Sequence, residues 1–140
     1  NQMVYDKLKN EYNEQDIIIL GYSIGTGMAS NLASENNPKR LILQAPYYSL
    51  TDLAGQLFPF LPPFIIRYKF ANNQYLEDCT MPITIFHGNQ DEVIPYESSL
   101  WLKEEFKSKV HLIILDGVGH NGMTESEAYK RELKIILGTF

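Results

Sequence analysis

The sequence is poor in cysteine, in basic residues and in long apolar runs. Cys79 is the single cysteine among 140 residues, so no disulfide can form within the chain. Acidic residues outnumber basic ones by 17 to 12 and give a net charge of −5, which disfavours nucleic acid or an anionic membrane as a partner. No run reaches the roughly 18 apolar residues of a membrane span, and no signal peptide is visible. These absences favour a cytoplasmic protein without a membrane span or a nucleic-acid partner.

Short aliphatic runs alternate with segments of helical periodicity throughout the chain. We expect strands at 17–20, 41–43, 83–86 and 110–115. We expect four helices: one at 3–12, one from just after residue 23 to about residue 34, one that starts near residue 96, and a last one that reaches about residue 137. Continuous aliphatic strands are typical of parallel strands that are buried on both faces. The sequence therefore predicts a single α/β domain over residues 1–140, with a parallel sheet of about four strands and helices on both faces.

The segment 46–82 lacks such a pattern and is expected to be irregular. Its middle, 57–66, is very apolar and holds three prolines, which disfavour a regular helix or a paired strand. Two interpretations stay open for the segment. One is core packing with turns, and the other is a lid-like or pocket-wall insertion that contacts an apolar group.

Two of the predicted helices carry more specific expectations. The helix that starts near Tyr96 is expected to bury Leu100, Trp101 and Phe106. The residues Thr124-x-x-Glu127 match a capping box, so we expect them to open the last helix.

The pattern G-x-S-x-G occupies residues 21–25, between the strand at 17–20 and the helix that follows. Such a turn holds the hydroxyl of Ser23 clear of the backbone. It brings together the positions two before and two after the serine, so Gly21 and Gly25 are expected to lack room for a Cβ atom. The N–H groups at the start of the helix point toward the place where a negative oxygen would form. The pattern predicts that Ser23 is a nucleophile.

Two further loops after predicted strands carry the groups that such a serine needs. A serine hydroxyl requires an imidazole to take its proton, and the imidazole requires a carboxylate to orient it. Asp91 follows the third strand and His120 follows the fourth. Because the carboxyl ends of parallel strands meet at one edge of a sheet, we expect both residues near Ser23. The order Ser, Asp, His is that of the α/β-hydrolase sheet.

Other assignments stay open at this point. His87 ends its strand and could serve as the base, although we expect it to pack beside the acidic turn. His111 starts a strand, at the wrong edge of the sheet. Glu92 could replace Asp91 as the acid. No metal site is expected, because the three histidines and one cysteine lack the spacing of metal ligands.

The chain resembles the α/β-hydrolase superfamily of serine hydrolases, in particular its short-lid branch of acyl-protein thioesterase-like, depalmitoylase-like and bacterial esterases. The resemblance rests on residues 21–27, on 86–95 with its His-Gly-x-x-Asp spacing, and on Gly119-His120. It implies Ser23 as the nucleophile, Asp91 as the acid and His120 as the base, with no cofactor. It also implies that the backbone N–H of Ile24 contributes to an oxyanion hole. The substrate would be a small-molecule or acyl ester or thioester, and an amide is possible.

We expect Tyr22, Tyr47 and Val93 to line the substrate pocket. The alternative to catalysis is a hydrolase fold that acts as a binding or assembly module. A structure in which His120 lies well beyond hydrogen-bond reach of Ser23 would favour that alternative.

Members of the superfamily carry about four further strands before the strand that leads to the serine, and these 140 residues do not include them. One of the oxyanion donors comes from that part, so we expect these residues alone to be weak or inactive. The strand 17–20 has no charge or proline to protect an edge. We therefore expect it to pair with an N-terminal half of the protein or with another copy.

Overall fold

The fold is built on four parallel strands that pair in the order in which they occur along the chain. The computed structural model describes residues 1–57 and 70–138. The strands are β1 (Ile18–Tyr22), β2 (Arg40–Gln44), β3 (Ile83–Gly88) and β4 (Val110–Leu115). Each pairs in parallel with the next. The predicted parallel sheet is confirmed.

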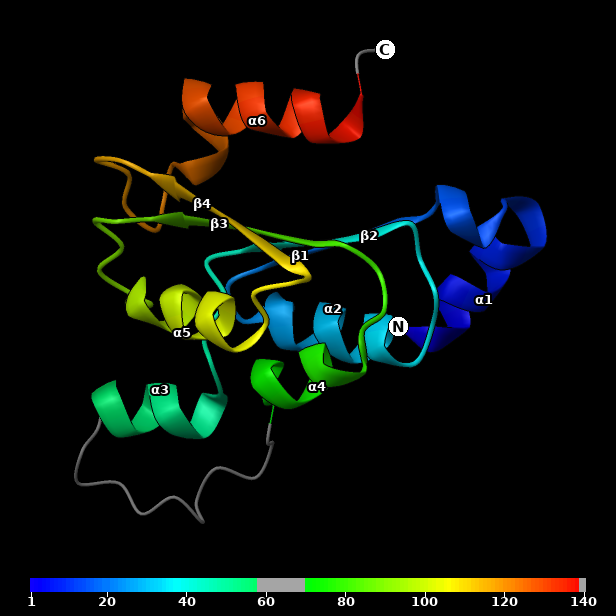
Figure 1. Cartoon of the computed structure of the whole chain (residues 1–140), viewed down its shortest axis with the longest axis horizontal. Helices are drawn as coiled ribbons and strands as arrows, with labels where there is room; N and C mark the ends of the chain where they lie inside the picture. The colour runs from blue at the N-terminus through cyan, green and yellow to red at the C-terminus, as the bar shows by residue number, and fades with distance from the viewer. Residues whose placement is uncertain (58–69, 139–140) are drawn as a thin grey trace.

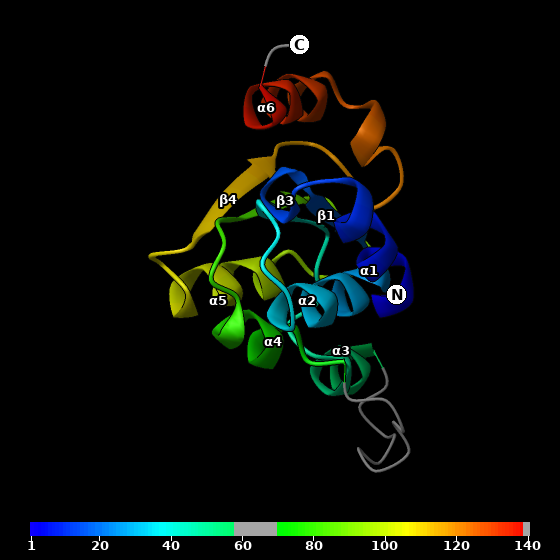
Figure 2. The same ribbon diagram turned by 90° about the vertical axis from the view of Figure 1, so that its right-hand side faces the viewer.

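Helices cover both faces of this sheet, as the sequence predicts. They are α1 (Gln2–Glu11), α2 (Gly25–Ser34), α3 (Leu50–Leu57), α4 (Asn72–Asp78), α5 (Glu97–Glu105) and α6 (Glu127–Leu137). Figures 1 and 2 show α2, α4 and α5 on one face of the sheet and α6 on the other, with α3 outside the layer of α2 and α4. This layering leaves the carboxyl ends of the strands, and the loops that follow them, along one edge.

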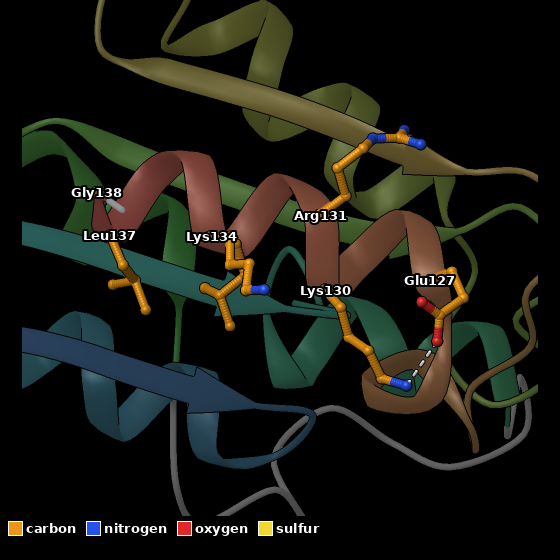
Figure 3. A pocket seen from close by; sticks show the side chains of 7 residues that line it. Glu127, Lys130, Arg131, Lys134, Leu137 and Gly138 are labelled. Carbon is orange, nitrogen blue, oxygen red and sulfur yellow. Dashed lines mark hydrogen bonds and ion pairs between the residues drawn. The ribbon is translucent and has the colours of Figure 1, made fainter. Parts of the chain in front are cut away.

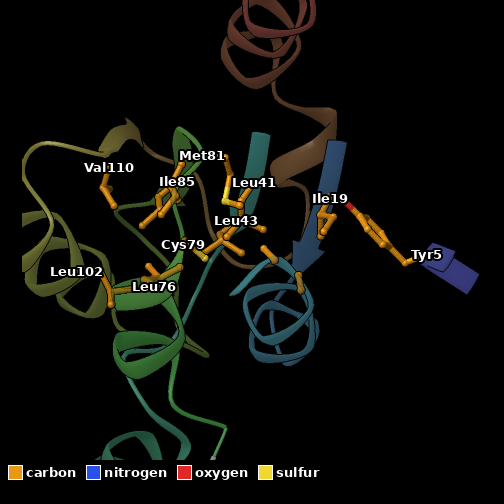
Figure 4. Close-up of a cluster of buried hydrophobic side chains, with 13 residues drawn as sticks. Tyr5, Ile19, Leu41, Leu43, Leu76, Cys79, Met81, Ile85, Leu102 and Val110 are labelled. Carbon is orange, nitrogen blue, oxygen red and sulfur yellow. The ribbon is translucent and has the colours of Figure 1, made fainter. Parts of the chain in front are cut away.

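Side chains of alternate strand residues fill a separate apolar cluster on each face. On the side of α2, α4 and α5, Leu41, Leu43 and Ile85 are fully buried, and Figure 4 shows them beside Leu76 and Leu102 from the helices. On the side of α6, a second cluster contains Ile42, Phe86, Leu115 and Tyr129. Neighbouring residues of β2 therefore point to opposite faces and are buried on both, which explains why the strand has no polar alternation.

The segment 46–82 contains two helices, so the expectation of an irregular segment is wrong there. The helix α3 ends at Leu57 and α4 begins at Asn72. The three prolines of the apolar middle lie outside both helices, and this is why their presence does not prevent helix formation. Most of that middle lies outside the described residues, so the lid remains a prediction.

Two detailed expectations about helices are also wrong. Leu100 and Trp101 are 40% and 45% exposed, while the inner face of α5 is formed by Leu102 together with the buried side chains of Ser98 and Ser99. Of the three expected residues, Phe106 alone packs against the core cluster, and it is partly buried there. The last helix begins after Ser126, whose hydroxyl accepts a hydrogen bond from the backbone N–H of Tyr129. Thr124 belongs to a preceding 3-10 turn. In both places a serine makes a polar contact that apolar periodicity does not reveal.

The strand β1 lies at one edge of the described sheet. It pairs with β2, and no further described strand lies on its other side. Leu20 is 49% exposed. A cavity of about 410 Å³ lies alongside this strand. It is lined by apolar residues of α1, β1 and α2, including Val4, Leu8 and Met28.

Candidate active site

A strained turn joins β1 to α2 and places Ser23 at its apex. Ser23 has a φ of +52°, which is unusual for a residue with a side chain. Two hydrogen bonds hold this conformation. The backbone N–H of Ser23 donates to the carbonyl of Gln44 at 2.8 Å, and the Thr26 hydroxyl donates to the carbonyl of Ser23 at 2.7 Å. The turn therefore has the geometry that the G-x-S-x-G pattern predicts.

The two glycines of the pattern do not have the same role. A Cβ atom on Gly21 would lie 2.6 Å from the Cβ of Ala29 and 2.9 Å from the carbonyl oxygen of Gly25. A Cβ atom on Gly25 would meet no described atom within 4 Å. The predicted close approach is thus real at Gly21, where α2 packs against β1, but the expectation is wrong for Gly25.

The side chains of Ser23, His120 and Asp91 form one hydrogen-bonded chain. Nε2 of His120 lies 2.9 Å from Oγ of Ser23. On the other side of the ring, Nδ1 of His120 donates to Oδ2 of Asp91 at 2.7 Å. Because the carboxylate accepts a hydrogen bond from Nδ1–H, the proton of the neutral imidazole stays on Nδ1 and Nε2 is free to accept the serine proton. Three loops from separate strands thus bring the three predicted residues together.

The carboxylate of Asp91 is fixed by donors on both of its oxygens. Oδ1 accepts from the backbone N–H groups of Val93 and Ile94, at 2.9 and 2.8 Å. Oδ2 faces Nδ1 of His120 and also Nε2 of His87, at 3.3 Å. Burial alone raises the pKa of Asp91, but hydrogen bonds from His87, Ile94, His120 and Val93 outweigh it and lower the pKa to about 2. The group is therefore ionised at neutral pH.

Tyr22 lies against His120 from the outer side. The two rings stack with centroids 5.2 Å apart and planes inclined by 27°. The Tyr22 hydroxyl donates to the backbone carbonyl of His120 at 2.9 Å. Burial raises the pKa of Tyr22, and the charges of Asp91 and Glu92 add to the effect, so the hydroxyl keeps its proton. Tyr22 thus supports the imidazole, and its place in a substrate pocket stays a prediction.

The remaining predicted residues have different surroundings. Ile24 directly precedes α2 as its N-cap residue, and the first N–H groups of a helix have no acceptor within it. Val93 is 42% exposed beside the Asp91 turn. Tyr47 is fully buried, and its hydroxyl lies where a side chain on Gly27 would be. Tyr47 therefore packs beneath α2, and we no longer place it at the pocket surface.

The alternatives for base and acid have other contacts. His87 is fully buried, and its ring nitrogens face Ser99 and Ile94. Glu92 accepts a long hydrogen bond, 3.4 Å, from the backbone N–H of His120 and not from its ring. His111 stands at the start of β4, at the opposite end of the sheet from the Ser23 turn. The geometry thus selects His120 and Asp91.

Sequence reasoning missed a buried polar contact that supports the serine turn. Nδ2 of Asn72 on α4 donates to Oγ1 of Thr26 at 3.1 Å and to the carbonyl of Tyr47 at 2.7 Å. Asn72 is fully buried. It therefore ties α4 to the residue whose hydroxyl holds the Ser23 carbonyl. No motif marked Asn72, because its partners lie 25 and 46 residues away.

Other features of the described residues do not enter this site. Within 1–57 and 70–138, no group of histidine, cysteine and acidic side chains could hold a metal ion. In the same ranges no helix is long and apolar enough to cross a membrane. A cavity of about 710 Å³ lies against α6, lined by residues that include Lys130, Lys134 and Leu137 (Figure 3). Its lining contains none of the Ser23, Asp91 and His120 side chains.

Comparison with known proteins places the chain among hydrolases. The Dienelactone hydrolase family matches residues 2–134. The chain is 32% identical over 120 residues to Alpha/beta hydrolase domain-containing protein 17B of Homo sapiens, and the match covers 86% of this chain and 41% of that protein. It is 30% identical over 113 residues to Lysophosphatidylserine lipase ABHD12 of Macaca fascicularis, covering 67% and 28%. The chain thus spans less than half of the length of these relatives.

Solved structures show the same fold at lower sequence identity. An acylaminoacyl peptidase from Pyrococcus horikoshii superposes with a TM-score of 0.74 at 16% identity, over 96% of this chain and 25% of that one. A monoacylglycerol lipase from Paleococcus ferrophilus gives 0.65 at 16% identity, over 96% and 71%. The match over residues 2–134 and the shared fold lead to one conclusion: the chain belongs to the dienelactone hydrolase family, within the α/β-hydrolase superfamily of serine hydrolases.

Proposed function

We propose that this hydrolase cleaves a carboxylic ester or thioester through an acyl-enzyme on Ser23. The observation that carries the proposal is the continuous chain from Ser23 through His120 to Asp91, with contacts of 2.9 and 2.7 Å. These lengths lie within the reach that proton transfer requires. A non-catalytic module would not need these three side chains in continuous hydrogen-bond contact, so the geometry favours catalysis over the alternative of a binding module.

The proposed reaction has two halves. Oγ of Ser23 attacks the acyl carbon while Nε2 of His120 takes the hydroxyl proton, and Asp91 stabilises the imidazolium. The tetrahedral intermediate collapses, and His120 returns the proton to the departing alcohol or thiol. Water then attacks the acyl-enzyme in the same way and releases the carboxylic acid and free Ser23. The low pKa of Asp91 keeps its charge available throughout.

The intermediate needs donors for its negative oxygen. We propose the backbone N–H of Ile24 as one of them, because it lies at the start of α2 directly after the nucleophile. The dipole of α2 adds to the favourable potential at this point. The loss of one such donor typically costs about 10²–10³ in kcat, which is the size of the contribution that we expect from Ile24.

The exposed apolar side chains around Ser23 support an acyl substrate. Tyr22, Ile24 and Val93 are 39%, 57% and 42% exposed. Burial of such surface by a hydrocarbon chain is favourable by about 25 cal/mol per Å². One matching relative is named a lipase, which agrees with the proposal of an acyl substrate. A series of p-nitrophenyl esters tests it: we expect octanoyl to be preferred over acetyl, and strict preference for acetyl would contradict an acyl-chain site.

A fluorophosphonate probe tests the nucleophile without any knowledge of the substrate. We expect one covalent adduct on the wild-type protein, and none on Ser23→Ala. Ser34→Ala, which alters a serine at the other end of α2, is the matched control and should be labelled like the wild type. Equal labelling of wild type and Ser23→Ala would refute the assignment.

A further inference from the structure

A second histidine and a second serine extend the hydrogen-bonded chain beyond Asp91. His87 is the next-to-last residue of β3, and Ser99 lies in the first turn of α5. Both side chains are fully buried. Nδ1 of His87 lies 2.6 Å from Oγ of Ser99, and Nε2 lies 3.3 Å from Oδ2 of Asp91. The contacts therefore run from Ser99 through His87, Asp91 and His120 to Ser23.

The neighbours of His87 determine which of its nitrogens carries the proton. Nε2 faces two acceptors, the carbonyl of Ile94 at 3.0 Å and the carboxylate of Asp91. Neither can donate, so Nε2 must carry hydrogen. Nδ1 of the neutral ring then accepts a hydrogen bond from the Ser99 hydroxyl. The acceptors at Nε2 thus set the tautomer of His87, and Ser99 holds the ring in its orientation.

We propose that His87 and Ser99 are positioning residues that hold the Asp91 carboxylate in the orientation that His120 needs. Oδ2 of Asp91 faces two imidazole nitrogens, Nδ1 of His120 at 2.7 Å and Nε2 of His87 at 3.3 Å, while the backbone of the 93–94 turn occupies Oδ1. Rotation of the carboxylate would break contacts on both oxygens. Ser99 is too deeply buried to meet a substrate, so its hydroxyl acts through His87 alone.

This inference rests on the proposed function, since it assigns the pair a role in the reactivity of Ser23. Its direct test does not depend on that reactivity. Nitrogen-15 NMR of the imidazole rings at about pH 8, where an ordinary histidine is neutral, should show His87 as the Nε2–H tautomer. Asp91→Asn should shift the His87 Nε2 resonance. An Nδ1–H tautomer, or a resonance that Asp91→Asn leaves unchanged, would overturn the proposal.

The functional test uses two neighbouring serines of α5. Ser99→Ala removes the anchor of His87, whereas Ser98→Ala alters an equally buried serine and serves as the matched control. We expect Ser99→Ala to slow fluorophosphonate labelling by about 10-fold to 100-fold, because the imidazole is less well aligned. Ser98→Ala should stay within about twofold of the wild type. Equal rates for both variants would contradict the proposal.

The pH dependence separates positioning from general destabilisation. His87→Gln keeps an N–H donor, and His87→Leu removes it. Without that donor the Asp91 charge acts more fully on the imidazolium of His120. The pH at which labelling reaches half of its maximal rate on the acidic side should therefore rise by roughly half a pH unit or more in His87→Leu. In His87→Gln this pH should return most of the way to the wild-type value. The other titratable groups near His120 are Tyr22 and Glu92, and these are unchanged in both variants.

Folding and function are distinguishable in these experiments. Circular dichroism checks each variant, and if His87→Leu does not fold, Ser99→Ala supplies the same comparison. If the wild type is not labelled at all, the proposed function fails, while the tautomer of His87 still decides whether the pair holds Asp91. An unmoved midpoint in a folded His87→Leu protein would contradict the inference.

Discussion

Nε2 of His120 lies 2.9 Å from Oγ of Ser23, although the two residues are 97 positions apart. The parallel sheet explains how this happens. Ser23 follows β1 and His120 follows β4, and the carboxyl ends of parallel strands lie at one edge. Asp91 follows β3 and completes the contact from the other side. The site is therefore a consequence of strand direction and loop position.

Removal of the negative charge at residue 91 should reduce reactivity strongly. In Asp91→Asn the side chain keeps its size but can no longer fix the Nδ1–H tautomer or stabilise the imidazolium. We expect the rate of labelling or hydrolysis to fall by about 10³–10⁴-fold. Glu92→Gln is the matched control, because Glu92 accepts a hydrogen bond from the backbone N–H of His120 and not from its ring. A larger loss of rate in Glu92→Gln than in Asp91→Asn would show that Glu92, and not Asp91, is the acid that orients His120.

The low pKa of Asp91 also predicts a dependence of stability on acid. Its native pKa, about 2, lies below the unfolded value of about 3.9. The group therefore stabilises the native state above the unfolded pKa, and this contribution disappears as the pH falls through the native pKa. Urea unfolding at several pH values should show a decline for the wild type between about pH 4 and pH 2. Asp91→Asn should lack this part of the decline.

The two glycines of the serine turn should respond differently to a methyl group. Gly21→Ala places a Cβ 2.6 Å from Ala29, so we expect a loss of about 1–3 kcal/mol in the free energy of unfolding. Gly25→Ala has open space among the described residues and should change stability by less than about 1 kcal/mol. Chemical denaturation measures both. Equal losses would show that packing of α2 on β1 does not decide the identity of residue 21.

The open edge of β1 should make the protein associate. We propose that this strand pairs with another polypeptide segment or a second copy, because its described outer side has no partner strand and Leu20 is half exposed. Leu20→Lys should weaken such pairing, whereas Leu100→Lys, a similar change on the outer face of α5, should not. Size-exclusion chromatography with light scattering measures the difference. A monodisperse wild-type monomer with β1 amides protected by its own chain would contradict the proposal.

Much of the fold was predictable because its signals are local. The aliphatic runs that became β1 to β4 are short and continuous, and the turn at Ser23 has a pattern of five residues. The positions of Asp91 and His120 followed from their place after parallel strands. These inferences needed only the chain direction and the common edge where strands end.

The details that failed depend on contacts between distant segments. The inner face of α5 contains Ser99 because its hydroxyl meets His87, and hydrophobic periodicity cannot reveal such a polar contact. Tyr47 looked like a pocket residue until the packing of Gly27 placed it in the core. The freedom of Gly25 likewise depends on how α2 crosses β1. Such features require coordinates.

The most direct measurement of the central claim is mass spectrometry after reaction with a fluorophosphonate, followed by peptide mapping. We expect a single adduct on the peptide that contains Ser23, lost in Ser23→Ala and strongly reduced in His120→Ala, with Ser34→Ala unchanged. Absence of any adduct on a folded protein that contains all of the chain its gene encodes, or an adduct on another serine, would contradict it.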